Sequence, residues 1–568
     1  MRGLDTLILL LFVLSAVGAS PVHGGELPVR NPADEGWTPV SSGVRNPLSL
    51  RQIRRITGVS EDGGAFVLDL GDPRYHGYIH AGPYPFETAE SDYDYPRYRV
   101  SSSLTDGRGM IQVSRFFRDK YNANDWPSDT MAVAYRLELY RAQGDGHCRP
   151  VGFCDGKVAF ELSGPTVGSG IARKVTIVEG PFLSLKRSDQ PDQVMVAWET
   201  DEPCTGTVYL SGPVEPGSGP PPFEVAAGSA AGTRHEALVG GLLPDREYRY
   251  YVECDGTRSP GYTFRSAPRR GEGEVCFAFA SDSREGVGGG ERNYMGHNLY
   301  MNSRLAQDAY RRGAEFLIFG GDLVNGYTTE TEDFALQLKG WKQGLSGFWR
   351  SRPVYPAMGN HETLLNTFVK GLQRLRMDKW PYASDSAEAV FAREFWNPAN
   401  GPKPADPRRP AYGENVYSFQ YGPVLCVAFN NNYWWSTNRL CERFGGCPEG
   451  YIMEDQLQWI ERTLAEAERD PTVRFVVLYA QEPVFPCGGH VGDAMWWGGD
   501  NNLRAHSRQG QRMLPESTGM IEARNRFWSA VSGCRKAAAV LAGDEHEYHR
   551  LLLSTSNRWY SCSSPAST

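Results

Sequence analysis

The second half of the chain alternates short apolar runs with longer amphipathic stretches, and this alternation limits the fold more than any other feature. The short runs are residues 275–280, 316–319, 354–358, 424–429, 475–479 and 537–541. Between them, residues 453–469 place Leu457, Ile460 and Leu464 on one helical face. The pattern predicts an α/β layered domain over residues 275–568, with functional sites at strand ends.

Polar residues of the kinds that bind metal ions follow four of these runs. They are Asp282, then Gly321-Asp322, then Gly359-Asn360-His361-Glu362, and finally Gly543-Asp544-Glu545-His546. A buried strand fixes the backbone, so a loop residue just beyond it can hold a carboxylate, amide or imidazole in a shared cleft. A Gly-Asp pair alone is most often a turn. Taken together and in this order, the four motifs indicate one site.

These blocks resemble those of the calcineurin-like metallophosphoesterases, and of the purple acid phosphatases in particular. The family pattern runs Asp-x-His or Asp-x-Gly, Gly-Asp, Gly-Asn-His-Glu, a His after a strand, and Gly-His-x-His. Residues 359–362 are the most specific match. The resemblance implies a four-layer α/β catalytic domain over residues 275–568 that hydrolyses phosphate esters.

The resemblance also implies roles for single residues. Asp322 would bridge two metal ions, Asp282 and His546 would complete the first ion, and Asn360 would help to hold the second. A bridging carboxylate holds two cations about 3.5–4 Å apart, a spacing that suits a phosphoryl group. His361 would face the phosphate and stabilise charge or protonate the leaving oxygen.

Arg284 takes a position where many relatives have a histidine, in the block Asp282-Ser283-Arg284. Its fork of donors would bind a substrate phosphate, and a salt bridge at the cleft edge is the alternative. Asn325 stands where the purple enzymes have their tyrosine, and Tyr327 comes two positions late, so no purple colour is expected.

Two ligand histidines of the family are replaced. Gln481 stands where relatives have a His after a strand, and Asp544 replaces the first His of the last block. The second metal would then be held by Asp322, Asn360 and Asp544, with Gln481, Glu482 or His490 as the remaining candidates. Such an oxygen-rich set favours Mn, Fe, Mg or Ca over Zn at that position.

The expected cofactor is therefore a pair of divalent or trivalent ions, Fe, Mn or Zn, and a single ion is the alternative. The expected function is that of a secreted, acid phosphatase-like phosphomonoesterase that uses metal-bound hydroxide on a small phosphate-ester substrate. One alternative is a phosphodiesterase or nucleotidase of the same fold. The other is a non-catalytic binding protein on a degenerate metallophosphoesterase scaffold.

The first half of the chain predicts two β-rich units, which makes the protein multidomain. Residues 30–170 carry short extended runs separated by Gly, Pro and Asp, with no evident role. Residues 173–267 predict a β-sandwich. The tyrosine that follows Leu243-Pro244 is similar to the corner of a fibronectin type III domain, and purple acid phosphatases carry a comparable sandwich.

The start of the chain and its cysteines both suggest export. Residues 1–19 have the layout of a secretory signal peptide, which predicts a secreted or periplasmic protein without stable membrane insertion. Eleven cysteines allow disulfides. The spacing suggests Cys148 with Cys154, Cys441 with Cys447 and Cys204 with Cys254, whereas Cys276 and Cys426 are expected to be core thiols.

Charge limits the class of partner. The net charge of -8 and the pI near 5.9 give no basic field, so a nucleic-acid polymer is not an expected partner. The aromatic tract at residues 75–98 allows a glycan or cell-surface contact through the N-terminal module, although tyrosines on sheets mostly pack.

Overall fold

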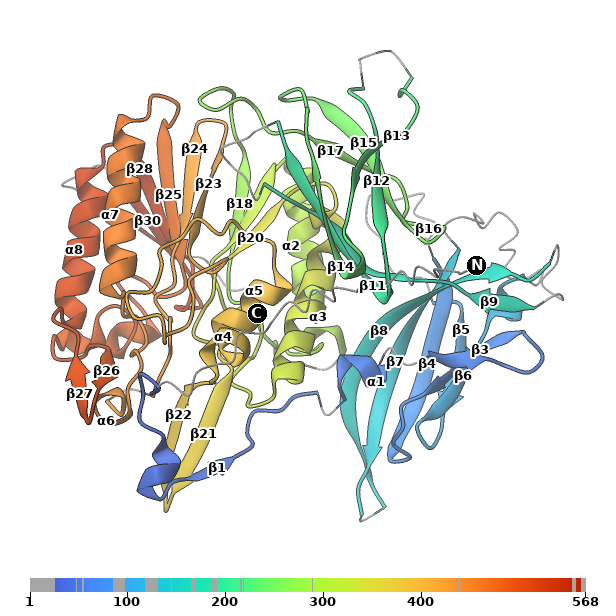
Figure 1. The fold of residues 1–568 in the computed structure, drawn as a ribbon, viewed down its shortest axis with the longest axis horizontal. Coiled ribbons are helices and arrows are strands. Elements are labelled where there is room, and N and C mark those ends of the chain that lie inside the picture. The colour runs from blue at the N-terminus through green and yellow to red at the C-terminus, as the bar shows by residue number, and fades with distance from the viewer. Residues whose placement is uncertain are drawn as a thin grey trace, which may run out of the picture.

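The computed structural model describes residues 26–562 except for 47, 54–55, 85–97, 118–130, 145, 165–169, 186–191, 215–216, 218, 289, 438 and 554–557. The predicted leader at residues 1–19 and most of the aromatic tract lie outside the described residues. Figure 1 shows two β-rich units beside a larger α/β unit.

The α/β unit has two sheets whose central strands are parallel. One sheet has the order β18-β19-β20, and the other β23-β24-β25-β28-β30-β29. Their strands are β18 (Phe277–Ala280), β19 (Phe316–Phe319), β20 (Val354–Pro356), β23 (Tyr417–Tyr421), β24 (Val424–Ala428), β25 (Phe475–Ala480), β28 (Ala537–Ala542), β29 (His549–Leu553) and β30 (Arg558–Cys562). The six apolar runs all form strands, with ends that differ from the prediction by at most two residues.

Helices cover the outer faces of both sheets (Figure 1). Helices α2 (Leu299–Arg311) and α3 (Thr331–Trp349) share a core with β19, together with α5 (Ala387–Glu394). Helices α7 (Glu454–Arg469) and α8 (Met520–Gly533) share another core with β24, β25 and β28. Leu457, Ile460 and Leu464 are buried on α7, as their spacing predicts.

The remaining apolar faces of the two sheets share a core with the β-sandwich. The sandwich pairs sheet β10-β11-β14 with sheet β13-β12-β15, and β16 and β17 add to β15. The strands are β10 (Ile177–Ser184), β11 (Val194–Cys204), β12 (Gly206–Ser211), β13 (Glu224–Gly228), β14 (Gly232–Val239), β15 (Glu247–Cys254), β16 (Thr257–Arg258) and β17 (Tyr262–Arg265). The predicted tyrosine corner is present, because the backbone N–H of Leu243 donates to the Tyr248 hydroxyl at 2.8 Å.

The N-terminal module contains sheets β5-β4-β7-β8-β9 and β2-β3-β6. Its strands are β2 (Ile56–Val59), β3 (Ala65–Asp69), β4 (Tyr75–Tyr84), β5 (Val100–Leu104), β6 (Arg108–Gln112), β7 (Ala132–Ala142), β8 (Cys148–Leu162) and β9 (Ile171–Arg173), and a short helix α1 (Leu50–Ile53) precedes them. The module core also buries Tyr294, Leu299 and Leu336 of the α/β unit, so it packs directly beside α2 and α3.

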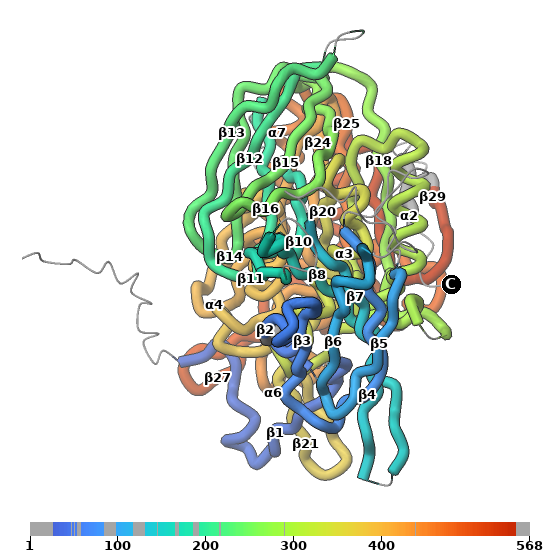
Figure 2. The backbone as a smooth tube through the Cα atoms, turned by 90° about the vertical axis from the view of Figure 1, so that its right-hand side faces the viewer, coloured from blue at the N-terminus to red at the C-terminus, as the bar shows by residue number. Residues whose placement is uncertain are grey.

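The chain before this module runs along the α/β unit. Strand β1 (Thr38–Val40) pairs antiparallel with β21 (Leu365–Lys370), which pairs with β22 (Gln373–Asp378), and both views place β1 there (Figure 2). Residues 30–46 thus lie away from the module in which the sequence placed them. The other small elements of the α/β unit are α4 (Tyr382–Asp385), α6 (Cys441–Phe444), β26 (His506–Gln509) and β27 (Arg512–Pro515).

The predicted disulfides are wrong, because the cysteines of all three predicted pairs are free thiols. Cys148 and Cys154 lie on the same strand, β8, and six residues of extended chain span roughly 20 Å, far beyond disulfide reach.

The other two pairs stay open although their members are close in the fold. The Sγ atoms of Cys204 and Cys254 lie within 4.8 Å of each other, but Trp198 Nε1 donates to Cys254 Sγ at 3.1 Å. Cys441 and Cys447 face different backbone carbonyls, those of Arg504 and Tyr451.

The two cysteines that were expected to be core thiols, Cys426 and Cys276, differ in their exposure to solvent. Cys426 is buried in β24, as predicted. Cys276 is exposed, because β18 begins one residue later at Phe277, so the prediction of a core thiol is wrong there.

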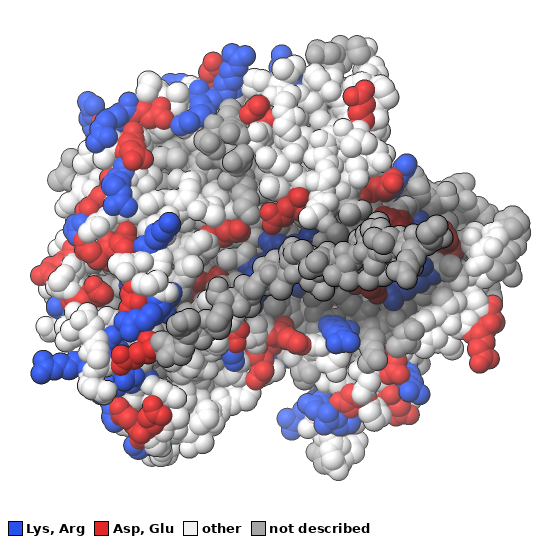
Figure 3. Space-filling view, in the orientation of Figure 1, with Lys and Arg blue, Asp and Glu red and all other residues white. Residues whose placement is uncertain are grey.

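Lys/Arg and Asp/Glu side chains are interspersed over the face shown in Figure 3. Among the described helices, none combines the length and the apolar character that a membrane crossing requires.

Two buried carboxyl groups, Asp378 at the end of β22 and Glu388 on α5, face each other. Asp378 Oδ1 accepts from the backbone N–H groups of Lys379 and Ala387, and Glu388 Oε1 accepts from that of Trp434 at 2.7 Å. The other oxygens, Asp378 Oδ2 and Glu388 Oε2, have no donor. Burial raises the pKa of both groups, so the pair shares a proton in the folded chain.

Because the folded-state pKa is raised, the unfolded chain releases this proton above the usual carboxyl range, about pH 4, while the folded chain keeps it. The free energy of unfolding should therefore fall with rising pH. In Glu388→Gln the amide can donate to Asp378, so the decline should become shallower. Urea denaturation from pH 5 to 9 measures this, with exposed Glu466→Gln as the control. An unchanged slope in Glu388→Gln would contradict the shared proton.

Candidate metal centre

Three aspartates lie just beyond parallel strands with their backbone in the left-handed region. The φ angles are 57° for Asp282, 52° for Asp322 and 72° for Asp544, and His546 follows with 52°. A non-glycine residue in this region costs of order 1–3 kcal/mol and persists where its surroundings hold it there. The repetition of this conformation after β18, β19 and β28 marks one shared edge of the two sheets as a functional site.

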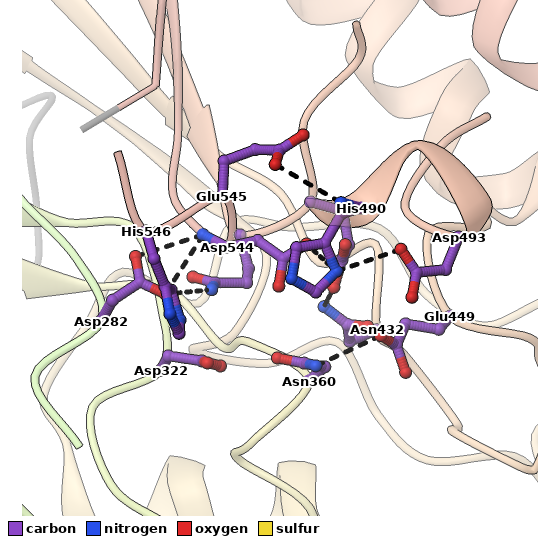
Figure 4. Close-up of polar contacts among 12 residues, drawn as sticks. Asp282, Asp322, Asn360, Asn432, Glu449, His490, Asp493, Asp544, Glu545 and His546 are labelled. Carbon is purple, nitrogen blue, oxygen red and sulfur yellow. Dashed lines mark hydrogen bonds and ion pairs between the residues drawn. The ribbon is translucent and has the colours of Figure 1, made fainter. Parts of the chain in front are cut away.

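The first cluster joins Asp282, Asp322 and His546, whose ligand atoms all lie within 4.8 Å of one another (Figure 4). His546 Nε2 is 3.6 Å from Asp282 Oδ1. Asp282 is fully buried and accepts from the backbone N–H of Asp544 at 3.1 Å. The structure thus brings together the three residues that the sequence assigns to the bridging and first-ion positions.

Gln481, at the end of β25, belongs beside this first cluster. Its Nε2 donates to Asp282 Oδ1 at 2.9 Å, and its Oε1 has no hydrogen-bond partner. The sequence places Gln481 among the candidates for the second ion, and the structure places its amide nitrogen against Asp282 of the first cluster.

A second cluster lies beside the first and contains Asn360, Asn432 and Asp544 (Figure 4), together with Glu482, which contacts Asn432 and interacts with Asp544. Asn360 Nδ2 donates to Glu449 Oε1 at 3.2 Å, and Asn432 Nδ2 donates to Glu482 Oε1 at 3.1 Å. All four side chains of the cluster are buried. Three of them have one oxygen without a hydrogen bond, namely Asn360 Oδ1, Asn432 Oδ1 and Glu482 Oε2.

His490 borders this second cluster from a loop. Its Nδ1 lies 3.0 Å from Asp493 Oδ1 and 3.1 Å from Asp544 Oδ2. The hydrogen bond with Asp493 and the nearby negative charge of Asp544 raise the pKa of His490 to about 9. The sequence names His490 as a candidate, and the structure places it at the site.

His361 and Arg284 form the other side of the centre. His361 Nδ1 lies 2.8 Å from the carbonyl oxygen of Asn325, to which it donates, so Nε2 carries the lone pair and meets the Arg284 guanidinium. Burial and the positive charge of Arg284 lower the pKa of His361 to about 3, which keeps the ring neutral. Arg284 also reaches His546 Nε2 at 2.9 Å and lies 3.9 Å from Asp322 Oδ2.

Negative charge dominates the buried part of the centre. Burial, reinforced by the charge of Asp282, raises the pKa of Asp322 well above its usual range. Burial likewise raises the pKa of Asp544 to about 7, and burial with the charge of Asp544 raises the pKa of Glu482. Arg284 is the guanidinium that borders these carboxylates among the described contacts. Buried carboxylates in such excess call for cations.

Two residues of the centre were not identified from the sequence. Asn432 lies in the run Asn430-Asn431-Asn432 directly after β24, so the rule that located the other blocks would have found it. Glu449 lies in a loop with no neighbouring strand end, and no local signal marks it. It is held by Trp435 Nε1, which donates to its Oε2 at 3.1 Å.

Three tryptophans, Trp434, Trp435 and Trp497, pack and support the loops of the centre. Trp434 is buried in a core, and the indoles of Trp435 and Trp497 both donate to Glu449, the latter to its backbone carbonyl at 2.8 Å. Tyr327 meets the His361 ring edge-on, with centroids 4.8 Å apart. Aromatic groups therefore border the second cluster and hold its carboxylate support.

No protein-family model matches the chain. Two curated relatives from Mycobacterium tuberculosis, both described as uncharacterized proteins (MT2654 and Rv2577), are 26% identical over 251 residues. This match covers 43% of the chain and 41% of each relative, so the chain spans less than half of the relatives' length.

The chain also has matches among solved structures. A purple acid phosphatase, PPD1 from yellow lupin seeds, matches at TM-score 0.48 and 13% identity, covering 88% of this chain and 82% of that one. PhoD matches at 0.42 and 13%, covering 69% and 77%, and a dimetal phosphatase from Danio rerio at 0.32 and 13%, covering 52% and 88%. At this level of likeness, the activity of the chain has to follow from its own side chains.

Glu362 ties the two central loops of the centre together. Its Oε1 accepts from the backbone N–H of Val324 at 3.1 Å and its Oε2 from that of Gly359 at 2.8 Å. Burial raises the pKa of Glu362 to about 7. The carboxyl group thereby holds the loop after Asp322 against the loop that carries Asn360.

Replacing Glu362 by alanine should leave both N–H groups buried without an acceptor. Each such group costs about 1–3 kcal/mol, so the free energy of unfolding should fall by at least about 2 kcal/mol. Glu362→Gln retains a carbonyl acceptor and should lose less. Chemical denaturation of both variants checks this, and equal stability of Glu362→Ala and the parent protein would exclude the clamp.

Proposed function

We propose that this protein is a metal-dependent phosphoesterase, and more specifically an acid phosphatase-like phosphomonoesterase. The observation that carries the proposal is the meeting of Asp282, Asp322 and His546 within 4.8 Å at one edge of two parallel sheets. Helices outside two sheets that face each other suit the four-layer domain that the sequence resemblance implies, and the tyrosine corner suits a fibronectin-like sandwich before it.

The residues present fit a pair of cations. Asp322 Oδ2 of the first cluster and Asn360 Oδ1 of the second are buried acceptors with no hydrogen bond, and the two side chains point toward each other in Figure 4. Asp282, Asp322 and His546 would hold one ion, and Asp322, Asn360 and Asp544 would contribute to the other. Bound ions of this kind polarise a phosphoryl oxygen, lower the pKa of a coordinated water and orient the reacting groups.

Arg284 supports a phosphate as the reacting group. Its guanidinium lies between His361 and His546, next to the first cluster, and is partly exposed, so two donors can turn toward a phosphate oxygen. The charge of Arg45 also reaches His361. Two positive groups near His361 suit the anionic phosphate of a monoester.

His361 can move a proton at its Nε2 atom. Asn325 fixes the proton on Nδ1, so Nε2 can accept a proton from a phosphate hydroxyl and pass it to the leaving oxygen once Arg284, which contacts Nε2, turns toward the phosphate. Because the ring is neutral, Nε2 transfers a proton and does not supply one of its own. The proton that reaches the leaving group therefore originates from the monoanionic ester. This step favours substrates that carry a proton on the phosphate, as at acidic pH.

Export from the cytoplasm is part of the proposal, and it is supported by the leader-like pattern of residues 1–19. The substrate is a small phosphate ester.

Asp322→Asn tests the proposal most simply. It retains the shape of the side chain but removes the shared charge, so metal content should fall and hydrolysis of p-nitrophenyl phosphate should drop by at least about 100-fold, or roughly 2.7 kcal/mol. Asp308→Asn on α2, whose ion pair with Arg312 is exposed, is the control and should behave as the parent. Full activity in Asp322→Asn would contradict the proposed function.

Arg284→Gln tests the phosphate-binding role. A charge-assisted hydrogen bond contributes about 1.5–3 kcal/mol, so kcat/KM should fall about 10- to 100-fold, and inhibition by inorganic phosphate should weaken in parallel. Exposed Arg292→Gln in the same loop region is the matched control. If phosphate inhibits Arg284→Gln as strongly as the parent, Arg284 does not bind the phosphate.

A further inference from the structure

We infer that Glu482 and Asn432 are ligands of the second cation, and that this position is a hard-cation site selective for Mn²⁺, Mg²⁺ or Ca²⁺ over Zn²⁺. The inference rests on the proposed function, since it concerns the ion beside Asn360. Neither residue lies in the blocks that identify the first cluster. Both come from strand ends of the second sheet, Asn432 after β24 and Glu482 after β25.

The orientation of the two amides points to a cation. Asn360 and Asn432 each commit the side-chain nitrogen to a carboxylate, Glu449 and Glu482 respectively. The carbonyl oxygen of each amide is left buried without a donor. A buried acceptor without a partner costs about 1–3 kcal/mol, and a bound cation removes that cost. Both amides are thus set to offer oxygen to a positive ion.

Glu482 is held in place by groups that leave one carboxylate oxygen free. The Asn431 side chain makes two hydrogen bonds with the backbone of Glu482. It accepts from the Glu482 N–H at 3.2 Å and donates to the Glu482 carbonyl oxygen at 2.9 Å. Asn432 then fixes Oε1, and Oε2 has no hydrogen bond although the side chain is only 1% exposed. The charges of Glu482 and Asp544 act on each other, which places the two carboxylates side by side. An ion between them would compensate both.

His490 and Glu545 border the open side of this position. Glu545 Oε1 accepts from the backbone N–H of Cys487 at 2.7 Å, which holds the loop that carries His490. His490 in turn lies between Asp493 and Asp544. One imidazole at the border contrasts with four oxygen donors from Asn360, Asn432, Glu482 and Asp544.

The donor set determines the class of ion. Carboxylate and amide oxygens suit Mg²⁺, Ca²⁺ and Mn²⁺, whereas Zn²⁺ favours sites with imidazole and thiolate. The first cluster retains an imidazole ligand, His546, so the two positions should differ in preference. A hard, exchangeable ion at the second position is the expected outcome.

The test counts metal ions in the full chain after removal with chelator and reloading with Mn²⁺ alone or Zn²⁺ alone. We expect two Mn²⁺ per chain in the parent protein, and weakening of one by at least about tenfold in Glu482→Gln and in Asn432→Ala. Glu466→Gln, exposed on α7, is the matched control. Titration by Mn²⁺ electron paramagnetic resonance measures the sites without relying on activity, and circular dichroism confirms folding of each variant.

Tb³⁺ luminescence provides a second readout. Trp435 and Trp497 both contact Glu449 and lie close enough to sensitise a lanthanide at the second position. The Tb³⁺ signal should appear in the parent, be displaced by Ca²⁺ or Mn²⁺ more readily than by Zn²⁺, and be lost in Asn432→Ala even where Glu482→Gln folds poorly.

The possible failures are separable. If the parent binds no metal and hydrolyses no phosphate ester, the proposed function fails and the inference with it. If the parent binds two Mn²⁺ and hydrolyses p-nitrophenyl phosphate while both variants retain both ions with unchanged affinity, only the inference is overturned. A parent that binds Zn²⁺ more tightly than Mn²⁺ at both positions also overturns it.

Discussion

Buried carboxylates at one edge of two sheets are the constraint on which the rest of the centre depends. Asp282, Asp322 and Asp544 are held there in the left-handed region, almost entirely out of water. Bound cations or protonation must offset such a charge excess, since an isolated buried charge is far more costly than a bent loop. The amides of Asn360 and Asn432 and the guanidinium of Arg284 are arranged around this need.

Rigid support explains how the strained loops persist. Glu362 fastens the loops after β19 and β20 to each other, and the sandwich anchors the helices behind them. Lys342 is fully buried and pairs with Glu179 of the sandwich at 2.9 Å and with Glu394 of α5 at 3.1 Å. Trp349 Nε1 donates to the carbonyl of Leu183 at 2.9 Å. The β-sandwich thus supports α3 and the first sheet through these contacts.

Much of this architecture could be predicted from the sequence because the strands of an α/β domain are short, continuous and apolar. The six runs after residue 275 predicted the strands, and the polar residues that follow four of them predicted the first cluster. Contacts between residues far apart in the sequence could not be predicted in this way. Nothing in the local sequence shows that Gln481 turns its amide toward Asp282, or that Glu449 reaches Asn360.

The predicted disulfides were wrong for a related reason, since spacing along the chain says little about separation in space. Cys148 and Cys154 are near in sequence yet far apart on one extended strand. The pairing of β1 with β21 shows the opposite, because residues 38–40 join a strand more than three hundred positions later. Helices and strands can be predicted from periodic patterns in the local sequence. Contacts that depend on the topology of the whole fold cannot.

The most direct test of the account is anomalous X-ray diffraction at the manganese edge from crystals of the protein equilibrated with Mn²⁺. The account predicts two anomalous peaks that share Asp322, one also touching Asp282 and His546 and the other touching Asn360 and Asp544. Absence of any peak at this edge of the sheets, or Mn²⁺ bound only elsewhere, would contradict it.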